Sequence, residues 1–98
     1  MASRDGAVAR ALAFFDSNGF RDRLADLVAI PSTSQDPDHE ADVQRYVEGA
    51  MRPWLERLGF EVAIHPNPSS GFGPILTAER HEGASLPTVL TYGYGKGY

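Results

Sequence analysis

A chain of 98 residues has room for one small domain, and its 42% hydrophobic and 22% charged residues are ordinary for a globular protein. The absence of cysteine excludes disulfides and thiolate metal sites, and the net charge of −4 disfavours a nucleic-acid surface. No apolar run is long enough to span a membrane, and residues 1–10 lack the apolar core of a signal peptide. We therefore expect a cytoplasmic protein with neither nucleic-acid nor membrane partners.

Two short helices are predicted in the first thirty residues. Apolar residues recur at helical spacing over about 5–15: Val8, Leu12 and Phe15. Residues 16–19, Asp-Ser-Asn-Gly, interrupt this pattern because they favour turns and caps. A second helix follows, with Ser17 or Asn18 as its N-cap, and it ends before Pro31. Its apolar face carries Phe20, Leu24, Leu27 and Val28.

The strongest helix signal lies over residues 36–58. Asp36 can cap the first turn, and Pro37 suits the first helical position, where its missing N–H costs nothing. A wide apolar stripe predicts packing against a sheet, with Trp54 buried; it comprises Val43, Tyr46, Val47, Ala50, Met51, Trp54, Leu55 and Leu58.

Two positions near the end of this helix predict local features of its backbone. Pro53 is expected to kink the helix because it removes one hydrogen bond and crowds the carbonyl of Gly49. Gly59 is expected to be a left-handed C-cap, with Phe60 packing on Leu55 in a Schellman arrangement.

Three strands are predicted after the helices. Residues 60–64 and 74–78 are rich in strand formers and are separated by a loop of proline, serine and glycine. A third strand is predicted over 88–93, where Val89 and Leu90 are adjacent, a pattern typical of a strand covered on both faces. The order of elements predicts an α/β fold in which helices pack on a small mixed sheet.

Three segments resemble, in the same order, segments of the M20 family of zinc peptidases and aminoacylases. They are 27–32 (LVAIPS), 55–62 (LERLGFEV) and 87–93 (PTVLTYG). The resemblance implies that residues 1–98 form a single N-terminal segment of a phosphorylase/hydrolase-like catalytic domain. In that family two zinc ions and a glutamate base activate a water that attacks an amide carbonyl.

The metal-binding positions of that family are replaced in this chain. The family's strand ends in Gly-His-x-Asp, whereas Tyr94 stands at the histidine position and Lys96 at the aspartate position. A phenol is protonated at neutral pH, and an ammonium group repels a cation. No catalytic or metal-binding residue is therefore carried over, and we expect no cofactor here although zinc belongs to the family. We therefore expect the chain to be a truncated, inactive fragment with an atypical Gly/Tyr tail at 93–98.

Three other groups of residues have both a functional and a plainer interpretation. His39, His65 and His81 lack ligand spacing, which leaves ordinary surface histidines or a metal site formed by folded proximity. The tail resembles a phosphate-binding loop but lacks both a following helix and the Ser or Thr of the Walker form. Ser32, Thr33 and Ser34 could suggest a nucleophile, but no base is identifiable, and hydroxyls before a helix usually form turns and caps.

A second hypothesis makes the chain a stand-alone interaction module. The segment that begins at Thr88 and ends at Tyr92 has no charge between Pro87 and Lys96, so its strand edge would be open to pairing. Strand addition or swapping between two copies through this segment predicts a homodimer.

Overall fold

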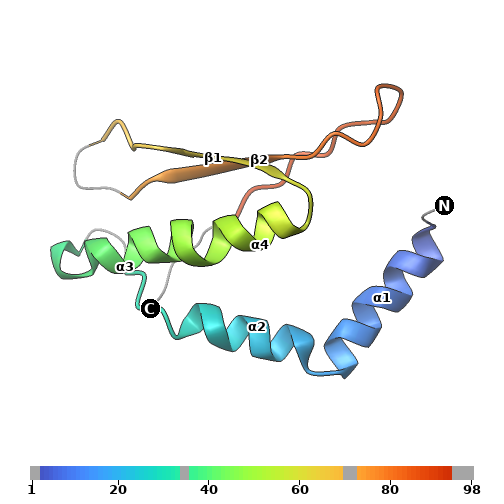
Figure 1. Ribbon diagram of the computed structural model, residues 1–98, viewed down its shortest axis with the longest axis horizontal. Helices are drawn as coiled ribbons and strands as arrows, with labels where there is room; N and C mark the ends of the chain where they lie inside the picture. The colour runs from blue at the N-terminus through green and yellow to red at the C-terminus, as the bar shows by residue number, and fades with distance from the viewer. Residues whose placement is uncertain (1–2, 34–35, 70–72, 94–98) are drawn as a thin grey trace.

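The computed structural model describes residues 3–33, 36–69 and 73–93. In this part of the chain, two helices precede a long third helical segment and a two-stranded antiparallel sheet. Figure 1 shows the long helix running alongside the sheet, while α1 points away from both. The fold is therefore a small mixed α/β arrangement with helices packed on a sheet, which confirms the coarse prediction.

Helices α1 (Arg4–Asp16) and α2 (Gly19–Val28) form a corner. The Ser3 hydroxyl caps α1 by accepting a hydrogen bond from the Gly6 N–H at 3.0 Å. Asn18 precedes α2 as predicted, but it acts through a left-handed backbone, with φ of 67°, and makes no side-chain cap bond. The Phe14 ring lies over Gly19, where an added Cβ would come within 2.5 Å of the ring. This close approach favours glycine at the corner.

The long helix begins with the predicted cap. The Asp36 carboxylate accepts a hydrogen bond from the Asp38 N–H at 3.0 Å, and a 3₁₀ turn, Pro37–His39, leads into α3 (Glu40–Gln44). A π-helical segment, Arg45–Met51, then connects α3 to α4 (Arg52–Arg57).

The sequence predicted a kink at Pro53, and the structure has the π-helical segment just before this residue. The Arg52 N–H bonds to the Val47 carbonyl, five residues back. Because proline has no N–H, one ordinary helical bond cannot form at Pro53, and the wider turns immediately precede it.

The end of α4 confirms the predicted Schellman motif. Gly59 has φ of 89°, in the left-handed region. The Phe60 N–H bonds to the Leu55 carbonyl at 3.0 Å, and the Gly59 N–H bonds to the Glu56 carbonyl at 3.0 Å. These bonds satisfy two carbonyls of the last turn and direct the chain into the sheet.

The sheet consists of β1 (Glu61–His65) and β2 (Ile75–Glu79), with Val62 opposite Ala78 and Ile64 opposite Leu76. Alternate residues of β1 are partly buried, as expected for a sheet with one covered face. In the connecting loop, the Asn67 amide donates to the Gly73 carbonyl at 3.2 Å. Gly73 in turn lies against Val43 of α3, where an added Cβ would come within 2.8 Å.

The predicted third strand is wrong. Residues 88–93 form no strand, and the described sheet is antiparallel and two-stranded instead of mixed. Val89 and Leu90 are 82% and 94% exposed, so neither is covered as the sequence suggested. A strand requires a hydrogen-bonded neighbour, and in the described sheet residues 88–93 pair with neither β1 nor β2.

The described residues enclose almost no core. Val47 is their one buried apolar residue, and the accessible surface of the chain is 8157 Å². A compact monomer of this mass exposes about 5,500 Å². The radius of gyration, 15.8 Å, also exceeds the ~12.6 Å of a compact domain of this length. The chain therefore leaves much apolar surface uncovered. No helix in the described ranges has the length and apolar character needed to cross a membrane.

Candidate functional site

The positions that the M20 resemblance singled out, Tyr94 and Lys96, lie outside the described residues, as does most of the tail at 93–98. Within residues 3–33, 36–69 and 73–93, no group of three or more His, Cys, Asp or Glu side chains is placed to hold a metal ion. The structure therefore adds no candidate metal centre to those considered from the sequence.

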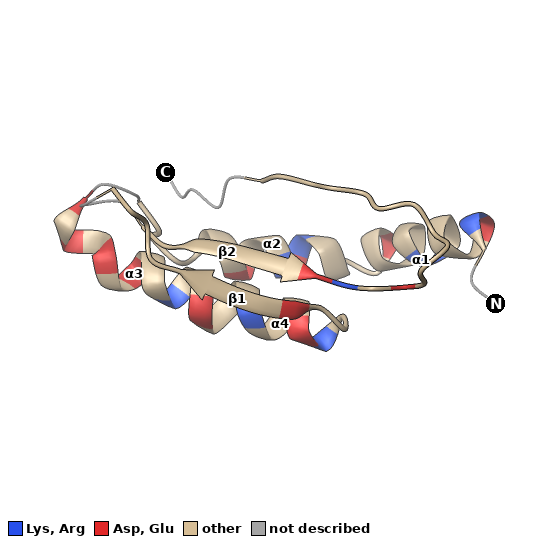
Figure 2. Ribbon diagram, turned by 90° about the horizontal axis from the view of Figure 1, so that it is seen from above, with Lys and Arg blue, Asp and Glu red and all other residues tan. Residues whose placement is uncertain are grey.

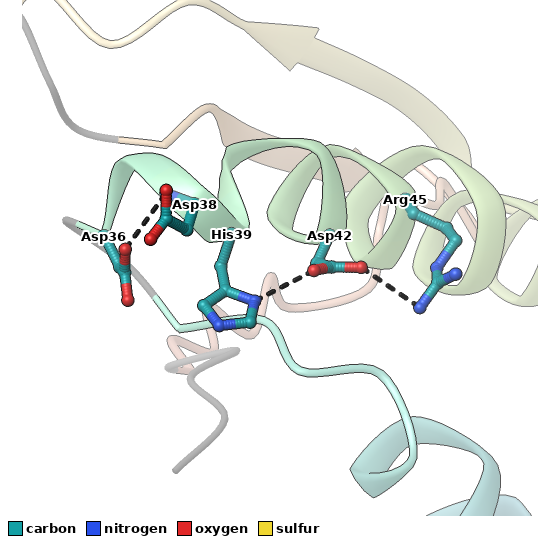
Figure 3. A network of polar contacts seen from close by, with 5 residues as sticks. All are labelled: Asp36, Asp38, His39, Asp42 and Arg45. Carbon is teal, nitrogen blue, oxygen red and sulfur yellow. Dashed lines mark hydrogen bonds and ion pairs between the residues drawn. The ribbon is translucent and has the colours of Figure 1, made fainter.

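His39 belongs to a polar network at the start of the long helix (Figure 3). Its Nδ1 lies 2.9 Å from one carboxylate oxygen of Asp42, and Arg45 contacts the other oxygen at 3.2 Å. The hydrogen bond to Asp42 raises the pKa of His39; burial opposes this shift, and the charges of Asp36, Asp42 and Asp38 add to it. The network links the first turns of the helix through one shared carboxylate.

The other two histidines lie apart from this network. His65 Nε2 is 2.9 Å from Thr77 Oγ1, across the paired strands, and His81 is exposed beyond the end of β2. The three histidines therefore occupy separate elements, and the structure does not bring them together. Their interpretation as ordinary surface histidines fits this arrangement.

Ser32 is part of the connection between α2 and the long helix. Its N–H bonds to the Ile30 carbonyl at 2.7 Å, and the Thr33 N–H bonds to the Pro31 carbonyl at 2.9 Å. These bonds close two successive three-residue turns. Ser32 is 2% exposed, whereas Ser34 lies outside the described residues. The predicted turn-forming role fits this geometry better than a nucleophile would.

Trp54 is not buried in the way the sequence suggested. It is partly exposed, and the Arg23 guanidinium carbon lies 3.7 Å from the centroid of its ring. This cation–π contact joins α2 to α4, so part of the ring faces a charge and not the apolar interior. The sequence carries a signal for this contact: Arg23 follows Phe20 by three residues and precedes Leu27 by four, at the edge of the apolar face of α2.

Exposed apolar side chains are the most distinctive surface feature of the molecule. They occur on α1 and α2 and again after the sheet, where Leu86, Val89 and Leu90 are all more than half exposed. Figure 2 shows that the described chain after Glu82 carries no charged residue. Two separate regions are therefore suited to association with another polypeptide.

Comparison with protein-family models, curated proteins and solved structures yields no match to this chain. The resemblance to M20 enzymes rests on the three sequence segments alone.

Proposed function

We propose that this chain is an M20-like N-terminal segment that has no amide hydrolase activity of its own and works as a self-associating module. The observation that carries the proposal is the accessible surface of 8157 Å². It exceeds the expectation for a compact monomer by about 2,650 Å². A second copy can therefore supply the cover that one chain lacks.

The segment that begins at Thr88 and ends at Tyr92 is the proposed contact with the second copy. Val89 and Leu90 project apolar side chains from an uncharged stretch, so no charge opposes pairing. In the described sheet, β1 and β2 each have one partner, which leaves an outer edge on each strand. Addition of an extended segment to such an edge supplies backbone hydrogen bonds, and alternate side chains add apolar contacts.

Val89→Lys tests this contact. We expect wild-type protein to sediment as a dimer at high micromolar concentration and the variant to have a raised dissociation constant, because the lysine places a charge within the apolar contact. Ser85→Lys is the matched control, since it adds the same charge to the same uncharged stretch but before Pro87. It should leave the mass unchanged. A wild-type chain that is a folded monomer at this concentration would overturn self-association.

The absence of hydrolase activity is a separate expectation, based on Tyr94 and Lys96. Dipeptides and N-acyl amino acids should remain intact when incubated with the pure chain and added zinc, at the rate of a protein-free sample. A parallel sample treated with a chelator controls for contaminating metalloenzymes. Zinc-dependent, chelator-sensitive amide hydrolysis that follows the protein through purification would contradict this part of the proposal.

A further inference from the structure

We propose a second interface between copies of this chain, formed by the exposed apolar face of α1 and α2, with the two α1 helices packed antiparallel. The inference rests on the proposed function in one respect, namely that the partner is another copy. It differs in the surface used, because α1 and α2 lie in the first third of the chain, far in sequence from the 88–92 segment. The two contacts can therefore be disrupted separately.

The surface is a continuous helical strip of six residues. Its members are Val8, Leu12 and Phe15 of α1 and Phe20, Leu24 and Val28 of α2. Each is between 48% and 72% exposed. The rings of Phe15 and Phe20 lie with centroids 6.1 Å apart, and this contact joins the two rows across the corner. At 1.5 Å per residue, the two helices together are roughly 35 Å long.

The helical strip presents a large exposed apolar area. A large apolar side chain contributes on the order of 150–200 Å², so six residues about half exposed leave roughly 600 Å² of apolar surface. This is as large as the largest apolar patch of a typical monomer. The pairing of two α1 helices covers the α1 half of this strip, roughly 300 Å² on each copy and 600 Å² in the pair, which is the size of a weak, concentration-dependent contact. Figure 1 shows that α1 extends away from the sheet and the long helix, which leaves the α1 part of the strip uncovered.

The charges of α1 identify a second copy as the occupant and antiparallel as the direction. Arg4 is the first residue of α1 and Asp16 is the last, so each opposes the helix dipole at its own end, although Asp5 complements it. In an antiparallel pair, Asp16 lies beside the positive N-terminus and Arg4 of the other helix. The arrangement that is unfavourable within one helix becomes favourable between two.

One register pairs two apolar residues and two opposite charges, although it places Phe15 at the level of the partner's Asp5. Centring the pair on residue 10 places Val8 opposite the partner's Leu12 and Arg4 opposite the partner's Asp16. Each contact then occurs twice, because the same surface meets itself around a two-fold axis. Such an isologous interface closes as a dimer and does not extend into a filament through this surface.

Leu12→Lys tests the helical strip, with Ala13→Lys as the matched control. Adjacent helical residues point about 100° apart, so the control places the same charge on the same turn but outside the strip. We expect Leu12→Lys to raise the dissociation constant of the α1 contact roughly tenfold or more, and Ala13→Lys to leave it unchanged. The constants are measured by sedimentation equilibrium in the Val89→Lys background, where the 88–92 contact is absent. Because the α1 contact remains in that background, Val89→Lys should have a raised dissociation constant and dissociate fully only on dilution.

Exchanging the charges of Arg4 and Asp16 distinguishes an effect on the interface from an effect on the stability of α1 itself. Arg4→Asp and Asp16→Arg each improve the match to the helix dipole, so helicity measured by circular dichroism should stay constant or rise. Each single variant should nevertheless weaken association, because it sets like charges opposite each other. The double variant, with both charges exchanged, should restore wild-type affinity. Single variants that bind as tightly as wild type, or a double variant without rescue, would overturn the inference.

The outcomes distinguish this inference from the proposed function. If Val89→Lys is monomeric at every concentration while the wild type is dimeric, the α1 contact is absent and the 88–92 contact stands alone. If Leu12→Lys dissociates the wild-type dimer and Val89→Lys leaves its affinity unchanged, the helical strip stands and the proposed 88–92 contact fails. A wild-type chain that is monomeric alone and associates through Leu12 only with a different polypeptide would show that the occupant is not a second copy.

Discussion

Trp54→Ala should lower the free energy of unfolding by about 2–4 kcal/mol, the largest effect expected from any single change in the long helix. The indole contributes apolar contact on α4, and the guanidinium carbon of Arg23 lies 3.7 Å from the centroid of its ring. Alanine removes both, so α2 loses an attachment to the helix that contacts the sheet. A domain of this size has only several kcal/mol of stability, so the loss should be evident in urea titrations at constant protein concentration.

Two further variants divide the expected effect into its parts. Trp54→Phe keeps a ring for the cation and should cost less than Trp54→Ala. A double-mutant cycle with Arg23→Met should give a coupling of about 0.5–1 kcal/mol between the two side chains. An unchanged unfolding midpoint for Trp54→Ala would contradict the contribution assigned to the ring, and zero coupling would contradict the cation–π contact.

Sequence reasoning succeeded wherever structure depends on residues close together in the chain. The Asp36 cap and the Gly59 Schellman motif involve hydrogen bonds that span no more than five residues, so the residue types predict the geometry directly. The strands at 61–65 and 75–79 were also predicted to within one residue at each boundary. They follow a helix end and a loop whose turn chemistry is local.

The errors have a common physical cause, which is dependence on distant partners. Val89 and Leu90 suit a covered strand, but strand formation depends on a neighbour that composition cannot reveal. Trp54 fits a core position by its spacing, whereas its actual surroundings depend on Arg23, thirty-one residues earlier. The surfaces proposed for association also combine a local and a non-local property. The helical spacing of the apolar residues of α1 is visible in the sequence, whereas the exposure of these residues depends on where the other elements lie.

Two glycines, one inside the long helix and one just beyond its end, provide a paired test of backbone conformation. Substitution by alanine should change the stability of the protein in opposite directions at the two positions. Gly59 has φ of 89°, so Gly59→Ala should destabilise the protein by about 1–2 kcal/mol through strain at the C-cap. Gly49 lies inside the helix, where an added Cβ would make only an ordinary contact, 3.6 Å from Arg45 Cγ.

Gly49→Ala should therefore stabilise the protein by about 0.5–1 kcal/mol, because alanine loses less backbone entropy than glycine on entering a helix. Thermal unfolding at one protein concentration should place the two variants on opposite sides of wild type, with midpoints several degrees apart. The pair controls for the added methyl group, since both substitutions are chemically identical and differ only in backbone conformation. A neutral or stabilising Gly59→Ala would mean that Gly59 does not hold the left-handed conformation in solution, and the Schellman motif that turns α4 into β1 would be wrong.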